Sequence, residues 1–139
     1  MLAIALSALI ASHAPSTAMR TPTCSGADPA LAAIHPWLAS STPEVNRYKI
    51  GITVANVGRM KQAANVQQDV VMYRNEVKTD SKGVPPLRPG QSYTVTFTME
   101  RASGGDVNTT DLRFALVFRK PPPRAMDCNQ QNDSFMLEL

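Results

Sequence analysis

Apolar and polar residues alternate along three segments of the chain, which is typical of half-buried β-strands. The first segment covers residues 48–55, and its apolar face carries Tyr48, Ile50, Ile52 and Val54. The second covers residues 92–99, and its apolar face carries Tyr93, Val95, Phe97 and Met99. The third covers residues 112–120, and its apolar face carries Leu112, Phe114, Leu116 and Phe118. We therefore predict three strands that each bury one face.

Shorter apolar runs that end at turn-forming residues predict the remaining strands. An edge strand is expected at residues 31–34, because Pro36 disfavours helical backbone at the residue before it. A hairpin is expected with strands at residues 70–73 and 77–79 and a tip at residues 74–76, and a final strand in FMLEL. Pro89 and Gly90 should form a turn, since glycine permits a positive φ. About seven short strands, with no convincing helix among them, indicate an all-β sandwich.

The first 18 residues have the pattern of a secretory signal peptide. An apolar run from Leu2 to Ala11 is too short to cross a membrane, and small residues at positions 16–18 fit a cleavage site. No Lys or Arg precedes the run, which departs from the usual pattern and leaves a buried helix as the alternative. We predict a signal peptide at residues 1–18, an extended lead-in at 19–27 and one domain at 28–139, in a secreted or periplasmic protein that does not insert into a membrane.

Composition and motifs narrow the classes of function. The 139 residues carry a net charge of +3 and are 43% hydrophobic, which suffices for a packed core. The basic residues are not interleaved with aromatic residues, so we expect no nucleic-acid binding. His35 is the one histidine left after signal cleavage, and no nucleophile, zinc or phosphate-binding motif occurs. We therefore expect no enzymatic activity, no cofactor and no metal.

Four matches, in sequence order, resemble the CARDB family, the bacterial Ig-like modules named for cell-adhesion-related domains. The matching segments are ADPALAAI, ITVANVG, LRPGQSYTVTFT and DCNQQNDS. The second segment ends with Asn56 and Gly58, whereas Glu76 and Gln130 stand where the family usually has a glycine and an acidic residue. The resemblance covers about residues 27–139. It implies a seven-stranded, Ig-like antiparallel sandwich and does not imply an activity, because this fold serves many functions.

The stretch DCNQQNDSF near the C-terminus has more than one interpretation. Its alternating oxygen-bearing side chains could bind Ca²⁺ through Asp127, Asn129, Gln131 and Asp133. The stretch has only two carboxylates and lacks EF-hand spacing, so a polar turn with local side-chain hydrogen bonds is favoured. The sequons at residues 108–110 and 132–134 are acceptor sequences for glycosylation, but such triplets are common by chance. We interpret the stretch as a turn after which Phe135 and Leu137 return to the core.

The chain has two cysteines, Cys24 and Cys128. In the Ig-like fold that the resemblance implies, the start of the first strand and the loop before the last strand lie at the same pole. We therefore predict a disulfide between these cysteines, as expected for an exported protein. The alternative, a catalytic Cys128 that uses His35 as a base, is disfavoured because no orienting motif surrounds either residue.

The same pole should also carry a group of basic residues and a methionine. This predicted binding group consists of Arg59, Met60, Lys61, Arg119, Lys120 and Arg124. We hypothesise that it contacts an anionic partner, either a protein or a cell-surface polysaccharide, although a solvated rim explains the charges equally well. An inhibitor or immunity-type protein that blocks an enzyme through its loops is the alternative function. The single tryptophan, Trp37, is expected to fill the core rather than to bind.

Overall fold

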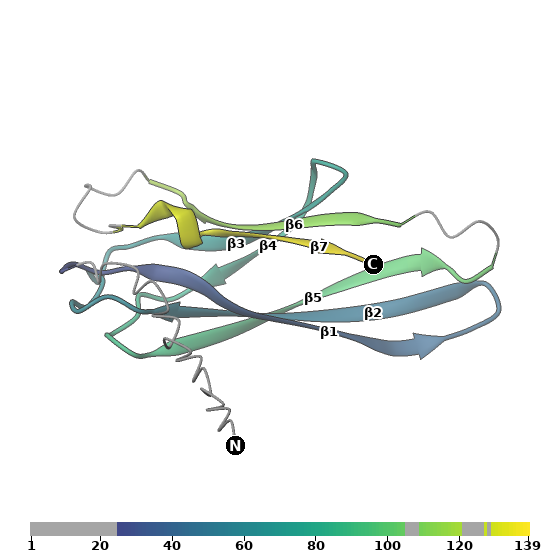
Figure 1. The fold of residues 1–139 in the computed structure, drawn as a ribbon, viewed down its shortest axis with the longest axis horizontal. Helices are drawn as coiled ribbons and strands as arrows, with labels where there is room; N and C mark the ends of the chain where they lie inside the picture. Colours follow the sequence, from purple (N-terminus) through teal and green to yellow (C-terminus); the bar gives the residue numbers. More distant parts are fainter. Residues whose placement is uncertain (1–24, 105–108, 121–126, 128) are drawn as a thin grey trace, which may run out of the picture.

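The computed structural model describes residues 25–104, 109–120, 127 and 129–139. Within these residues, seven strands form two antiparallel sheets that stack face to face (Figure 1). One sheet has the order β1-β2-β5 and contains β1 (Pro29–Ser41), β2 (Val45–Asn56) and β5 (Ser92–Ala102). The other has the order β4-β3-β6-β7 and contains β4 (Val77–Val84), β3 (Gln68–Arg74), β6 (Asp111–Phe118) and β7 (Ser134–Glu138). The predicted all-β sandwich is thus confirmed.

The alternating apolar faces of β2, β5 and β6 form the core between the sheets. Ile50, Ile52, Phe97 and Phe114 are fully buried. Phe97 of one sheet and Phe114 of the other meet at a ring-centroid distance of 5.4 Å and a tilt of 55°, a favourable aromatic geometry. The period-two patterns of the sequence therefore identified the inner faces correctly, except that Tyr93, near the start of β5, is 44% exposed.

The β3–β4 hairpin has a two-residue tip in which both residues take left-handed backbone conformations. Asn75 has a φ of 49° and Glu76 a φ of 65°, and the flanking residues Arg74 and Val77 pair directly. This is the conformation of a type I′ turn, whose twist matches that of the flanking strands. Glutamate is a poor residue for it, but the Glu76 carboxylate accepts hydrogen bonds from Arg113 at 3.0 and 3.2 Å. The ion pair partly offsets the backbone strain.

We predict that Glu76→Gly is more stable than Glu76→Ala by about 1 kcal/mol in chemical denaturation. Both variants lose the ion pair with Arg113, so their difference isolates the backbone cost of a side chain at a φ of 65°. Equal unfolding midpoints for the two variants would show that this turn is not strained.

Strand β1 is longer than predicted and runs through Pro36. The sequence predicted an edge strand at residues 31–34, whereas β1 extends from Pro29 to Ser41 and pairs with β2 along its length. The edge position is confirmed, because β1 has only β2 as a neighbour in its sheet. Proline is tolerated there since alternate N–H groups of an edge strand face solvent and have no partner to lose.

The prediction that Trp37 fills the core is wrong. Trp37 is 39% exposed and pairs with Lys49 on the outer face of the three-stranded sheet. A bulge between Leu31 and Ala33 shifts the register of β1 by one residue, which reverses the faces of the side chains up to Leu38, where a second bulge restores the alternation. Without the bulge, Trp37 would share the inward face of Leu31. The indole instead lies over Gly51, with Cζ3 3.6 Å from where a β-carbon would stand.

The final strand is confirmed, but one of its two predicted core residues is not buried. Leu137 packs against the core cluster, whereas Phe135 is 38% exposed. Strand β7 lies at the edge of its sheet and pairs only with β6. Phe135, opposite Phe114, is therefore covered from one side only.

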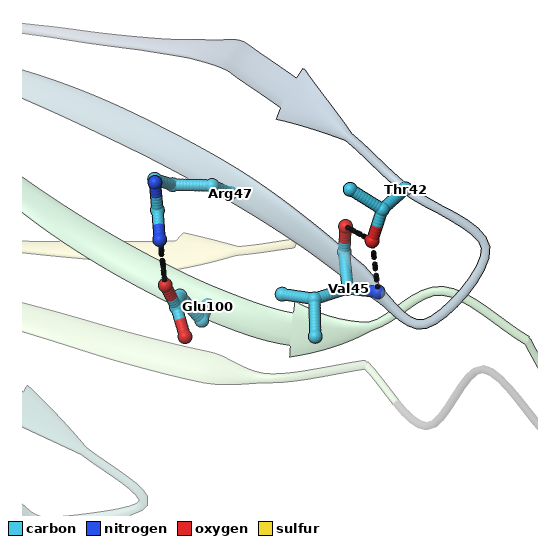
Figure 2. A network of polar contacts seen from close by, with 4 residues as sticks. All are labelled: Thr42, Val45, Arg47 and Glu100. Carbon is cyan, nitrogen blue, oxygen red and sulfur yellow. Dashed lines mark hydrogen bonds and ion pairs between the residues drawn. The ribbon is translucent and has the colours of Figure 1, made fainter.

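The two ends of the sandwich are closed by different means. At one end, the β1–β2 turn is held locally, because Thr42 Oγ1 accepts from Val45 N at 3.0 Å and donates to Val45 O at 3.1 Å (Figure 2). Close by, Arg47 of β2 forms an ion pair with Glu100 of β5 (Figure 2). The other end, where β1 begins, is closed by contacts between segments that are distant in the sequence.

Several predicted features lie outside the described residues and stay predictions. They are the signal peptide, the lead-in up to residue 24, Cys24, Cys128 and Arg124. Within the described ranges, no helix has the length and apolar character needed to span a membrane.

Candidate functional site

The candidate site is the end of the sandwich at which β1 begins, and we call it the loop pole. It consists of residues 25–28, the β2–β3 loop (57–67), the β4–β5 loop (85–91), residues 119–120, Asp127 and residues 129–133, and it lies at the left of Figure 1. The predicted meeting of the β2–β3 loop with the start of β1 is confirmed. Arg59 N donates to Gly26 O at 3.0 Å, and Val57 N donates to Asp28 O at 2.9 Å.

Asn56, the last residue of β2, connects the segments of the loop pole through its buried side chain. Its Oδ1 accepts from Asp28 N at 3.1 Å and from Gly58 N at 3.0 Å. Its Nδ2 donates to Met60 O at 2.8 Å and to Leu87 O at 3.1 Å. The amide thus satisfies backbone groups of the segment before β1, of its own loop and of the β4–β5 loop, which fixes these three segments relative to one another.

Gly58 allows the β2–β3 loop to pack directly on the backbone before β1. A β-carbon at this position would lie 2.2 Å from Gly26 O, 2.6 Å from Asp28 N and 2.9 Å from the Ala27 carbonyl carbon. All three are backbone atoms, so none can move away by a side-chain rotation. Only glycine fits at position 58, because the loop backbone and the backbone of residues 26–28 approach each other too closely for a β-carbon.

We predict that Gly58→Ala destabilises the domain by about 1–3 kcal/mol or more, because the new methyl group must push two backbone segments apart. Gly83→Ala is the matched control, since its β-carbon would stand 3.6 Å from the nearest atom, in ordinary contact. In urea denaturation, Gly58→Ala should unfold at a lower urea concentration than wild type. The free energy of unfolding of Gly83→Ala should stay within about 1 kcal/mol of the wild-type value. Equal effects of the two substitutions would contradict the close-approach argument.

A pair of buried glutamines joins the β2–β3 loop to the β4–β5 loop. Gln62 and Gln68 exchange two side-chain hydrogen bonds of 2.9 Å each. Gln62 Oε1 also accepts from Leu87 N at 3.0 Å, and Gln68 Nε2 donates to Pro85 O at 3.1 Å. Both side chains are buried, so this satisfied network holds the loop in one conformation.

The described members of the predicted binding group lie at the loop pole and are exposed. Arg59, Met60 and Lys61 follow Asn56, and Met60 is 60% exposed. Arg119 and Lys120 directly follow β6. They lie beside the end of the β2–β3 loop that leads into β3, where Arg119 N donates to Gln67 O at 2.9 Å. Arg119 also forms an ion pair of 3.0 Å with Asp69. Both clusters therefore border the β2–β3 loop, and their role in binding stays a prediction.

Beside the start of β1, the loop pole also contains a cluster of partly and fully buried acidic side chains. Asp28 and Asp127 are each 5% exposed, and Asp133 lies next to both of them. Asp28 Oδ1 accepts from Asn132 Nδ2 at 3.0 Å. The 3-10 turn η2 (Gln130–Asn132) begins where Asn129 Oδ1 accepts from Gln131 N at 3.2 Å. The predicted polar turn is therefore present, and it carries carboxylates inward.

Burial and like charge raise the pKa of two of these carboxyl groups. For Asp28, burial is the main cause of the raised pKa, the hydrogen bond from Asn132 opposes it and the charge of Asp127 adds to it. For Asp133, burial raises the pKa to about 9, aided by a hydrogen bond to Asp127 and by the charges of Asp127 and Asp28. Without a bound cation, Asp133 therefore holds a proton at neutral pH, and this proton is shared with the neighbouring Asp127 carboxylate.

We predict that the domain loses stability as the pH rises from about 5 to about 8.5 in chelator-treated buffer. The unfolded chain releases the Asp133 proton near the usual pKa of 3.8, whereas the folded protein holds it to about 9. The folded state therefore binds more protons between these values, and its stability falls as they are removed. Thermal melts of wild type should show this slope, and Asp133→Asn should flatten it. A midpoint that rises with pH in wild type would contradict the prediction.

Sequence reasoning found the acidic turn but missed its partner Asp28 and the glutamine pair. Asp28 lies 104 residues before Asn132, so no local spacing could reveal the contact. The glutamines carried no signal beyond two polar residues beside a strand.

Across the described ranges, no three or more His, Cys, Asp or Glu side chains are arranged to hold a metal ion.

Comparisons with known proteins place this arrangement among similar folds. The CARDB family pattern matches residues 29–114. A CARDB domain from Pyrococcus furiosus, crystallised in complex with di-metal ions, is 12% identical over 84% of this chain and 94% of that chain, with a TM-score of 0.54. A domain of a predicted cell surface protein from Methanosarcina acetivorans is 18% identical over 81% of this chain and 90% of that chain, with a TM-score of 0.55. A search of curated proteins gives no match.

Proposed function

The chain belongs to the CARDB family, and we propose that it acts outside the cytoplasm as a non-enzymatic module that binds an anionic partner at the cell surface. The partner is an acidic protein or a polysaccharide, and the loop pole is the surface that contacts it. The similar domain from the predicted cell surface protein of Methanosarcina acetivorans supports the location.

The observation that carries this proposal is the combination of a rigid framework with exposed basic residues on it. Asn56 and the pair Gln62–Gln68 fix the β2–β3 loop through buried hydrogen bonds. Exposed Arg59 and Lys61 project from that fixed loop. A preorganised loop loses little conformational entropy on binding, so its charges and the apolar Met60 can contribute to affinity.

Charge also favours an anionic partner over a neutral one. Arg59 and Lys61 stand two residues apart on one loop, and Arg119 and Lys120 follow each other at the other border of that loop. Clustered exposed charges of one sign raise the association rate with an oppositely charged surface.

We predict that the double variant Arg59→Glu, Lys61→Glu lowers binding of the purified protein to isolated cell envelopes by about tenfold at low ionic strength. The double variant Lys49→Glu, Lys78→Glu is the matched control, because it makes the same change of net charge at exposed positions of β2 and β4 outside the loop pole. The readout is the fraction of protein that sediments with the envelopes.

The control should bind like wild type, and added salt should weaken wild-type binding. Equal loss of binding in both double variants would show that net charge, and not the loop pole, controls the interaction. If wild-type protein does not bind to envelopes, the proposed surface role is wrong.

A further inference from the structure

Three buried side-chain oxygens at the loop pole receive no hydrogen bond from an N–H or hydroxyl group in the described part of the chain, and the acidic proton of Asp133 compensates only the two that belong to carboxyl groups. They are Asp127 Oδ2, Asn132 Oδ1 and Asp133 Oδ1. Buried polar atoms are nearly always paired, so each exception calls for a physical explanation. All three belong to the segment between β6 and β7, so one bound ion would compensate them together.

The surroundings of these oxygens favour a positively charged partner. The described charges that act on Asp133 are those of Asp127 and Asp28, and both are negative. Asp127 is only 5% exposed, so water cannot fully solvate its carboxylate. Buried like charges repel one another unless a cation or a proton lies between them.

The hydrogen bonds of the neighbouring atoms orient these oxygens. Asp127 Oδ1 accepts from Asn129 N at 3.2 Å, which leaves Oδ2 as the free atom of that carboxylate. Asn132 Nδ2 donates to Asp28 Oδ1 at 3.0 Å, so the amide oxygen of Asn132 points away from Asp28. Asp28 is held in turn by its own backbone N–H, which donates to Asn56.

We propose that Asp127, Asn132 and Asp133 form a binding site for a divalent cation, with Ca²⁺ as the best fit, and that Asp28 positions the Asn132 amide for it. Ca²⁺ would displace the proton of Asp133 into solvent, and the two carboxylates would then balance its double positive charge. Carboxylate and amide oxygens are the ligands that Ca²⁺ prefers. Mg²⁺ fits less well, because it requires near-ideal octahedral geometry and gives up its waters reluctantly. With few charged ligands, the site is weak, with a Kd of about 0.1–1 mM as in other extracellular modules.

The ion would link two parts of the loop pole that are far apart in the sequence. Its ligands lie in the segment between β6 and β7, and their support comes from Asp28 at the start of β1. Binding would therefore fasten the last strand to the first, next to the fixed β2–β3 loop.

The test compares thermal unfolding of the purified protein in chelator and in about 10 mM CaCl₂. Ca²⁺ should raise the midpoint of wild type by about 5 °C, because it binds the folded state and not the unfolded one. Asp127→Asn and Asp133→Asn should lose this response, and Asp28→Asn should weaken it. Asp111→Asn, which makes the same change at an exposed position of β6, should keep the full response.

Each other outcome overturns the proposal. No effect of Ca²⁺ on wild type means that a shared proton alone links the carboxylates. A full response in both Asp127→Asn and Asp133→Asn means that the ion binds elsewhere. An equal response to MgCl₂ overturns the choice of Ca²⁺.

A titration of wild-type protein followed by amide NMR keeps the test independent of how the variants fold. Ca²⁺ should shift the side-chain amide signals of Asn132 and the backbone signals of residues 129–134, and MgCl₂ should shift them less. Shifts confined to any other region would overturn the assignment of the site.

Discussion

The loop pole depends on one buried amide, that of Asn56. Its two polar atoms satisfy two backbone donors and two backbone acceptors. Aspartate could still accept from Asp28 N and Gly58 N, but its second oxygen would face the carbonyl oxygens of Met60 and Leu87 and repel them. An apolar residue would leave all four backbone groups buried without partners, which is costly. The pattern of donors and acceptors therefore requires asparagine, and three segments of the chain take their relative positions from it.

The hydrogen bonds of Asn56 also determine where the other groups of the loop pole can stand. Gly58 follows within two residues, and its lack of a β-carbon lets the β2–β3 loop rest on the backbone before β1. The same amide fixes the backbone of Asp28 by accepting from its N–H, and the Asp28 carboxylate in turn accepts from the side chain of Asn132. The exposed basic side chains and the buried acidic ones are thus supported by one continuous set of hydrogen bonds. A change at Asn56 would disturb both.

The fold was predictable from the sequence wherever local alternation determines which face is buried, as in β2, β5 and β6. It was not predictable in β1, because the bulge after Leu31 reverses the alternation and turns Trp37 to the outer face. Apolar character alone also overstated the burial of Phe135, which depends on whether a neighbouring strand covers it. The acidic turn was visible as a local motif. Its partner Asp28 was not, because that contact exists only once the first and last strands are in place.

Burial gives the two kinds of charge at the loop pole different physical roles. Arg59 and Lys61 are exposed, so water solvates their charges and contact with an anionic partner would cost little further desolvation. Asp28 and Asp127 are 5% exposed and have lost most of their hydration. They must be compensated within the fold, by a proton or by a cation. The acidic cluster therefore affects how stable the loop pole is, whereas the basic residues affect which partner the loop pole can contact.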